Sequence, residues 1–274
     1  MIALVTRAEP QDVELAVPEL RSGKSDHTLF KIAKGWASWP KPGSRTFERA
    51  VNAEYRDGPD GACVSTLYEG GTTWVTGPYV WPAFGVTKGN VPVIADTLPP
   101  GMKFFVSAGP RLLRQGVICD LPEELAVYRG YSGLMESSLR ERAGIGIAAD
   151  GVVVHVAMEY ATLYDVAVEL KQQGCIDAIA LDGGGSMGVV DSSGKVLIGH
   201  NVRKVCSALI FKRVIASVEQ PAAFPPSSLV LLERLSNGTR LAYFYSEKPS
   251  GLAAPNFKWA EFASKRTGRV FIAE

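Results

Sequence analysis

The residues of this sequence that could carry chemistry gather in one short segment, Asp182-Gly183-Gly184-Gly185-Ser186. An apolar run over 178–181 precedes the segment and is typical of a buried strand. Glycines let another group approach the backbone closely, and successive exposed N–H groups form a concavity that binds anions. A carboxylate, an open backbone and a hydroxyl therefore meet at one strand end. Because a plain turn between strands needs one glycine and seldom three, the pattern favours a functional turn.

Four further residues could complete such a site. Arg142 and Arg203 could clamp a phosphate or a carboxylate, because the planar guanidinium group binds these groups bidentately. Asn52 and Glu54 could orient sugar hydroxyls, and Glu54 could supply a second carboxylate. Structural alternatives stay open for all of them. Asp182 could cap the glycine turn, each arginine could lie on the surface, and Asn52 and Glu54 could belong to a turn at a strand end.

The histidines suggest no second centre. His155 alternates with valines in a predicted strand, which indicates a core or strand-face residue. His27 and His200 lie in polar segments where the sequence suggests no partner. A Ser-His-Asp triad stays open, although the sequence has no G-x-S-x-G segment. Gly144-x-Gly146 opens no helix, so we discard a dinucleotide-binding loop.

A phosphotransferase with an actin-like phosphate loop is a further alternative, because that loop also carries an aspartate, glycines and a hydroxyl. One residue separates the aspartate from the glycines in such a loop, whereas Gly183 follows Asp182 directly. The N-terminal segment also lacks the Asp-x-Gly-Thr partner loop. The sequence therefore disfavours this class.

The elements that must position these residues are mostly hairpins. The Asp150-Gly151 turn between 143–148 and 152–158 is the strongest hairpin signal. A helix is expected over 162–173, with Thr162 and Asp165 as a capping box. Further hairpins are predicted for 63–68 with 72–75, 84–87 with 91–94, 104–107 with 116–118, 188–190 with 196–198 and 229–235 with 239–245. Other strands are predicted at 2–6, 205–211 and 270–272, and other helices at 46–55 and 257–264.

These elements predict an α+β fold, a strand- and hairpin-rich mixed sheet domain with few helices. Residues 218–227 are rich in proline and read as a linker. We therefore expect one domain over 1–217 and a small appended C-terminal module over 228–274, in which we find no chemistry.

Composition excludes several classes of function. Of the 274 residues, 46% are apolar and 21% are charged, as in an ordinary globular protein. The net charge of +1 indicates no strongly positive surface that would bind nucleic acid or an anionic membrane. The four cysteines form no C-x-x-C pair, so we expect reduced thiols and neither a zinc site nor a disulfide framework. The N-terminus has no signal-peptide core, which predicts a cytoplasmic chain or one that has been trimmed.

The order of the motifs resembles the phosphodiester glycosidase family. The resemblance rests on the segment 142–147 with Asp150-Gly151, the helix 162–173, the glycine turn 180–186 and Arg203-Lys204-Val205. It is tight over about 103–212 and looser over 1–102, where Asn52 matches a strand end of the family. Two features depart from the family pattern. Met187 replaces a second hydroxyl, and Ala53 and Glu54 replace two glycines.

The resemblance implies a hydrolase that cleaves a glycosyl phosphodiester at the glycosidic side, with a small-molecule or glycan substrate. From the sequence we predict no cofactor and select no metal ligand. Such cleavage normally needs carboxylates, for which we expect Asp182, as general base or partner of the cationic sugar, and Glu54. The phosphate needs cations and donors. We expect these from Asn52, Arg142, Gly183, Gly184, Gly185, Ser186 and Arg203. A non-catalytic module that binds a phosphosugar or a nucleotide is the alternative.

Overall fold

The computed structural model describes residues 2–18, 27–38, 45–55, 62–78, 81–97, 99–126 and 139–221, and the backbone of four strands between 229 and 273. The chain divides into two units, Met1–Pro221 and Ala222–Glu274. All candidate site residues belong to the first unit. Residues 222–227 of the predicted linker lie outside the described residues.

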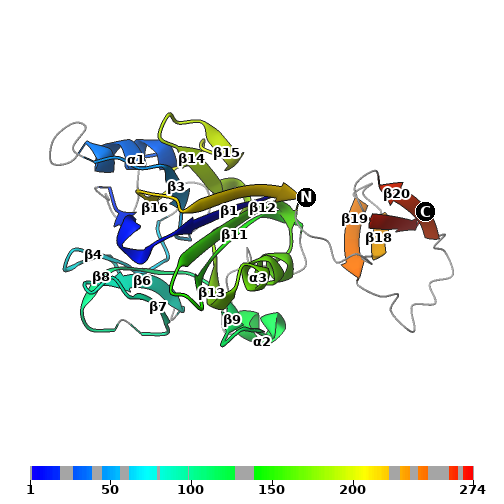
Figure 1. Ribbon diagram of the computed structural model, residues 1–274, viewed down its shortest axis with the longest axis horizontal. Coiled ribbons are helices and arrows are strands. Elements are labelled where there is room, and N and C mark those ends of the chain that lie inside the picture. Colours follow the sequence, from blue (N-terminus) through cyan, green and yellow to red (C-terminus); the bar gives the residue numbers. More distant parts are fainter. Residues whose placement is uncertain are drawn as a thin grey trace. The chain divides into compact units, whose positions relative to one another are not determined.

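A seven-stranded antiparallel sheet carries the glycine turn, with the strand order β10-β9-β13-β11-β12-β1-β17 (Figure 1). Its strands are β1 (Ile2–Ala8), β9 (Arg111–Arg114), β10 (Val117–Ile118), β11 (Arg140–Ala148), β12 (Val153–Ala161), β13 (Cys175–Leu181) and β17 (Ala216–Pro221). The first residues of the predicted linker, 218–221, thus continue this sheet through pairing with β1.

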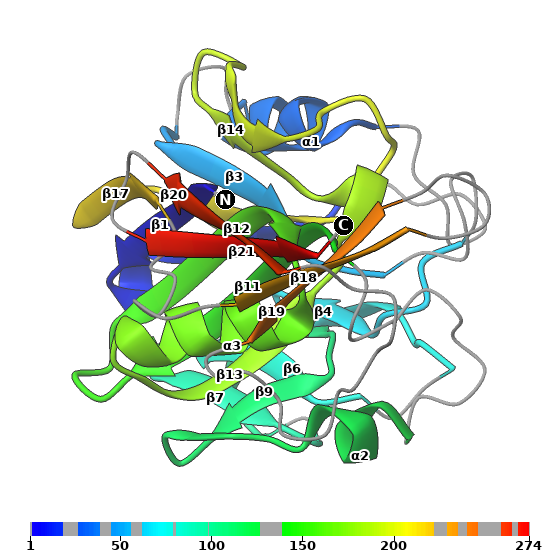
Figure 2. The ribbon, with the colours of Figure 1, turned by 90° about the vertical axis from the view of Figure 1, so that its right-hand side faces the viewer.

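Helix α3 (Leu163–Gln172) lies across β11, β12 and β13 (Figure 2). The predicted capping box is confirmed, because the Thr162 hydroxyl accepts from the Asp165 N–H at 3.1 Å and the Asp165 carboxylate accepts from the Thr162 N–H at 2.8 Å. The helix leads directly into β13. It therefore fixes the strand whose end carries Asp182.

A second antiparallel sheet brings the other half of the candidate site. Its order is β15 (Val196–Gly199), β14 (Gly188–Asp191), β3 (Arg49–Asn52), β16 (Ala208–Phe211) and β2 (Val13–Ala16). Helix α1 (Leu29–Ala37) packs on its outer face. The helix predicted over 46–55 is wrong. Strand β3 forms there because Val51 points into the central core and Ala50 toward α1, which is the alternation of a strand.

The third antiparallel sheet has the order β5 (Thr72–Val75), β4 (Leu67–Glu69), β8 (Met102–Ser107), β6 (Ala83–Thr87) and β7 (Pro92–Ala95). The hairpins β4–β5 and β6–β7 were expected. The predicted pairing of 104–107 with 116–118 is wrong, because β8 pairs with β4 and β6, and β10 pairs with β9. The remaining helices among the described residues of the unit are α2 (Leu121–Ala126) and the short 3₁₀ turns η1 (Pro10–Asp12) and η2 (Gly184–Ser186).

One apolar core joins the three sheets. Each sheet turns one face to it, represented by Ile145 in β11, Leu209 in β16 and Phe104 in β8, which are at most 1% exposed. Burial of such side chains stabilises each by roughly 1.5–3 kcal/mol. Because β3, β11 and β13 all contribute to this core, their ends are held at fixed positions relative to one another.

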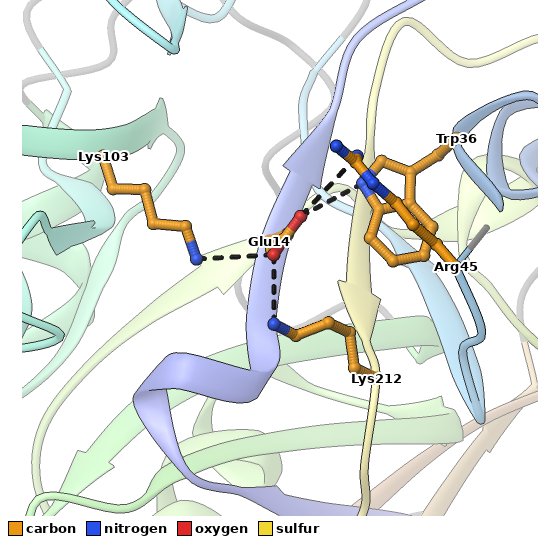
Figure 3. A network of polar contacts seen from close by, with 5 residues as sticks. All are labelled: Glu14, Trp36, Arg45, Lys103 and Lys212. Carbon is orange, nitrogen blue, oxygen red and sulfur yellow. Dashed lines mark hydrogen bonds and ion pairs between the residues drawn. The ribbon is translucent and has the colours of Figure 1, made fainter. Parts of the chain in front are cut away.

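A polar network around Glu14 adds a second connection between the sheets (Figure 3). Its carboxylate faces Lys212 Nζ at 3.1 Å and Lys103 Nζ at 3.5 Å, and it accepts from Trp36 Nε1 at 3.2 Å. Arg45 completes the network at 4.0 Å. Burial raises the pKa of Glu14, but the hydrogen bond from Lys212 and the charges of Lys103, Lys212 and Arg45 outweigh this effect and lower it.

The second unit contains two hairpins, β18 (Leu229–Arg234) with β19 (Arg240–Tyr245) and β20 (Trp259–Ser264) with β21 (Gly268–Ala273). A strand, not the helix predicted over 257–264, thus occupies 259–264. The strand- and hairpin-rich α+β class with few helices is confirmed, and every described strand pairing is antiparallel. None of the helices in the described part of the chain is long and apolar enough to cross a membrane.

Candidate active site

Four segments from two sheets meet at the candidate site. They are the end of β3, the turn after β13, the beginning of β11 and the loop that leads into β16. Asn52 connects the first two segments, since its amide donates to the Asp182 carbonyl at 3.4 Å and its Oδ1 accepts from the Gly188 N–H at 3.0 Å. This fully buried side chain therefore holds both ends of the glycine turn.

The turn itself is the 3₁₀ segment η2, and its glycines are needed for two different reasons. Gly184 has a φ of +57°, a left-handed conformation that costs a residue with a Cβ energy. A Cβ on Gly185 would lie 2.8 Å from Arg203 Cζ, so only glycine lets the guanidinium approach this closely. The glycine motif thus combines a left-handed backbone conformation at Gly184 with space at Gly185 for the guanidinium group of Arg203.

Asp182 lies at the centre of this arrangement and keeps some contact with solvent. Burial and the nearby charge of Glu54 raise its pKa to about 8, although the Ser186 hydroxyl, the Gly183 N–H and the charge of Arg203 act in the opposite direction. At neutral pH the carboxyl is therefore mostly protonated. This protonation state favours a proton donor over the general base that the sequence suggested.

Glu54 is the second carboxylate, but it is fully buried. It accepts hydrogen bonds from the backbone N–H groups of Cys206 and Ser207 and, at 2.6 Å, from the Ser207 hydroxyl. These contacts tie the end of β3 to the start of β16. Glu54 thus acts on the site through its charge near Asp182. Separately, no three metal-ligating side chains form a cluster within the described residues.

Two cations flank Asp182. Arg142 at the beginning of β11 is 3% exposed, and burial lowers its pKa while the charges of Tyr55, Asp182 and Glu141 raise it. Arg203 is exposed and stacks against Gly185. The structure therefore brings together every residue that the sequence selected: Asn52, Glu54, Arg142, Gly183, Gly184, Gly185, Ser186 and Arg203 with Asp182.

Two polar residues at the site escaped the sequence interpretation. The His200 Nε2 lies 3.5 Å from Glu141 Oε1, and the His200 N–H donates to the Met187 carbonyl at 2.8 Å. No spacing in the sequence indicates this pair, because the two residues come from different sheets. His155, in contrast, is a core residue as predicted; burial and the charge of Arg49 lower its pKa to about 3.

A family model described as phosphodiester glycosidase matches residues 45–212. The match covers more than half of the chain and includes all candidate site residues, so the resemblance of the motifs is confirmed. The chain belongs to the phosphodiester glycosidase family.

Two solved structures share the fold of this chain. The catalytic domain of zebrafish N-acetylglucosamine-1-phosphodiester alpha-N-acetylglucosaminidase, auto-inhibited by its pro-peptide, has a TM-score of 0.59 and 20% identity, with 76% of each chain covered. A hypothetical protein from Synechocystis has a TM-score of 0.59 and 14% identity, and the match covers 77% of this chain and 59% of that one. At identities this low, the likeness to these structures establishes the fold alone. A comparison with curated proteins found no match.

The departures from the family pattern leave the site's polar groups in place. Met187 is fully buried, and its sulfur would lie 2.8 Å from a Cβ on Gly199. It therefore packs in the core and removes no donor that faces Asp182. Glu54 adds a buried charge that raises the pKa of Asp182.

Proposed function

We propose that the protein hydrolyses a glycosyl phosphodiester, a sugar-1-phosphate diester, at the glycosidic side. The observation that carries the proposal is the position of Asp182 at the end of β13, beside Arg142 and Arg203, in surroundings that raise its pKa to about 8. Hydrolysis at C1 turns a singly charged diester into a phosphomonoester with more negative charge. The charges of Arg142 and Arg203 offset the negative charge of the bound diester and of the product, and the neutral Asp182 does not repel the diester before it gives up its proton.

Asp182 acts as the proton donor in this proposal. Its proton moves to the phosphate oxygen as the bond between C1 and that oxygen breaks. The hydroxyl of Ser186 and the N–H groups of Gly184 and Gly185, which close no hydrogen bond within the turn, contribute donors to the phosphate. The reaction then yields a free sugar and a phosphomonoester.

Hydrolysis in water enriched in ¹⁸O tests the proposal. We expect turnover of N-acetylglucosamine 1-(methyl phosphate) and related sugar diesters, with the label at C1 of the released sugar. Label in the phosphate instead would mean that the P–O bond breaks and would contradict the proposal. The same assay on the Asp182→Asn variant tests the role of that carboxyl. Asp96→Asn is the control variant, because Asp96 is an exposed carboxylate paired with Arg111 on another part of the unit.

A non-catalytic phosphosugar- or nucleotide-binding module is the competing function. The same arginines and glycine turn would serve it. Tight binding of a sugar 1-phosphate without turnover of any diester would favour that function.

A further inference from the structure

The pair His200–Glu141 lies directly beside the turn that carries Asp182. The His200 N–H donates to the Met187 carbonyl at the end of the turn. Glu141 contacts the other end, since a Cβ on Gly183 would lie 2.7 Å from the Glu141 carbonyl oxygen. The pair thus brackets the turn from two sheets.

Hydrolysis of a diester needs a group that accepts a proton from water as well as a group that donates one. Asp182 begins the reaction with its proton bound, and Glu54 is sealed from solvent with N–H and O–H donors on both carboxylate oxygens. The side chain of His200 is 45% exposed and can reach a water molecule. Among the described groups at the turn, this imidazole therefore has both the chemistry and the access of a base.

We propose that His200 is a second catalytic residue, which takes the proton from the water that attacks C1, and that Glu141 is its positioning residue. This inference rests on the proposed hydrolysis. Glu141 Oε1 at 3.5 Å favours a proton on Nε2 of the imidazole, so that Nδ1 keeps the lone pair for the water. A carboxylate that orients a histidine in this way recurs in unrelated hydrolases.

The proposed step balances. The water oxygen forms a bond to C1, and the bond between C1 and the phosphate oxygen breaks with its electron pair on that oxygen. One proton moves from water to His200, and one moves from Asp182 to the phosphate oxygen. After release of the sugar and the phosphomonoester, the proton on His200 returns to Asp182 through solvent.

The test compares His200→Ala and Glu141→Gln with Val202→Ala, an 81% exposed residue in the same loop. We expect His200→Ala to lower kcat by about 10²-fold or more at nearly constant KM, and free imidazole to restore part of the rate. Glu141→Gln should lower kcat about tenfold, because it leaves the imidazole in place without its orienting charge. Val202→Ala should behave as the wild type.

Several outcomes would overturn the inference. An active wild type with an equally active His200→Ala variant would remove His200 from the reaction and leave the proposed function intact. A loss that imidazole does not reverse and that appears in KM would assign His200 to substrate binding. If His200→Ala did not fold, His200→Asn would replace it in the same comparison. A wild type without diester turnover would reject the proposed function itself.

Discussion

At the scale of the residue, the protonation state of Asp182 decides which chemistry the site can perform. The sequence identifies the aspartate, but its charge state depends on Glu54, which is far away in the chain and adjacent in the fold. A carboxyl near another buried carboxylate holds its proton to a higher pH, as in the acid–base pairs of glycosidases. The role of Asp182 could therefore not be predicted from the sequence.

The pH dependence of kcat/KM follows from this environment, because kcat/KM reports the ionisation of the free enzyme. Asp182 must be protonated to act as an acid, so kcat/KM should fall as the pH rises through about 8, the pKa of this carboxyl. Glu54→Gln removes a charge that raises this pKa and should move the fall to lower pH. The pH–rate profiles of both proteins check the expectation, and a flat wild-type profile up to pH 10 would contradict it.

The two arginines should respond differently to replacement by lysine. Either change keeps the charge but loses the bidentate fork, so diester turnover should fall about tenfold or more. Arg203→Lys should leave the melting temperature unchanged because the residue is exposed, whereas Arg142→Lys should cost about 1–3 kcal/mol because Arg142 is 3% exposed. Turnover and thermal unfolding measure both effects. If both lysine variants matched the wild type in turnover, bidentate binding of the phosphate by Arg142 and Arg203 would be refuted.

At the scale of the element, the site depends on how β3 holds the glycine turn. Asn52→Ala removes the hydrogen bonds to the Asp182 carbonyl and to the Gly188 N–H. We expect a loss of about 1–3 kcal/mol in the free energy of unfolding and a lower kcat in the folded fraction, since the turn loses its support. Denaturant unfolding together with kcat checks this. Normal stability and kcat would show that β3 does not support the turn.

Elements with strong local signals could be predicted from the sequence, and those defined by tertiary packing could not. The capping box fixed α3, and Asp150-Gly151 fixed the hairpin β11–β12. The apolar spacing over 46–55 suggested a helix, but Ala50 and Val51 are buried on opposite faces of a strand. The pair His200–Glu141 had no signal at all, because packing of separate sheets creates it.

At the scale of the whole molecule, the Glu14 network couples the second sheet, which carries β3 and β16, to the third sheet through Lys103 in β8. The pKa of Glu14 is lowered, so the network stabilises the fold above the ordinary carboxyl pKa of 4.5 and loses this contribution as the pH falls below it. Glu14→Gln should therefore cost about 1–2 kcal/mol at pH 7 and less at pH 3. Unfolding at both pH values measures this. An equal cost at both would mean that the charge of Glu14 does not contribute.

The central claim is that Asp182 is the acid of a glycosidic hydrolysis at this turn, and the Asp182→Asn variant tests it most directly. Asparagine keeps the size of the side chain but cannot donate the proton. We predict that kcat for a sugar-1-phosphate diester falls on the order of 10²-fold or more, while the Kd of the sugar 1-phosphate and the melting temperature stay near those of the wild type. A folded Asp182→Asn variant with full turnover would contradict the account.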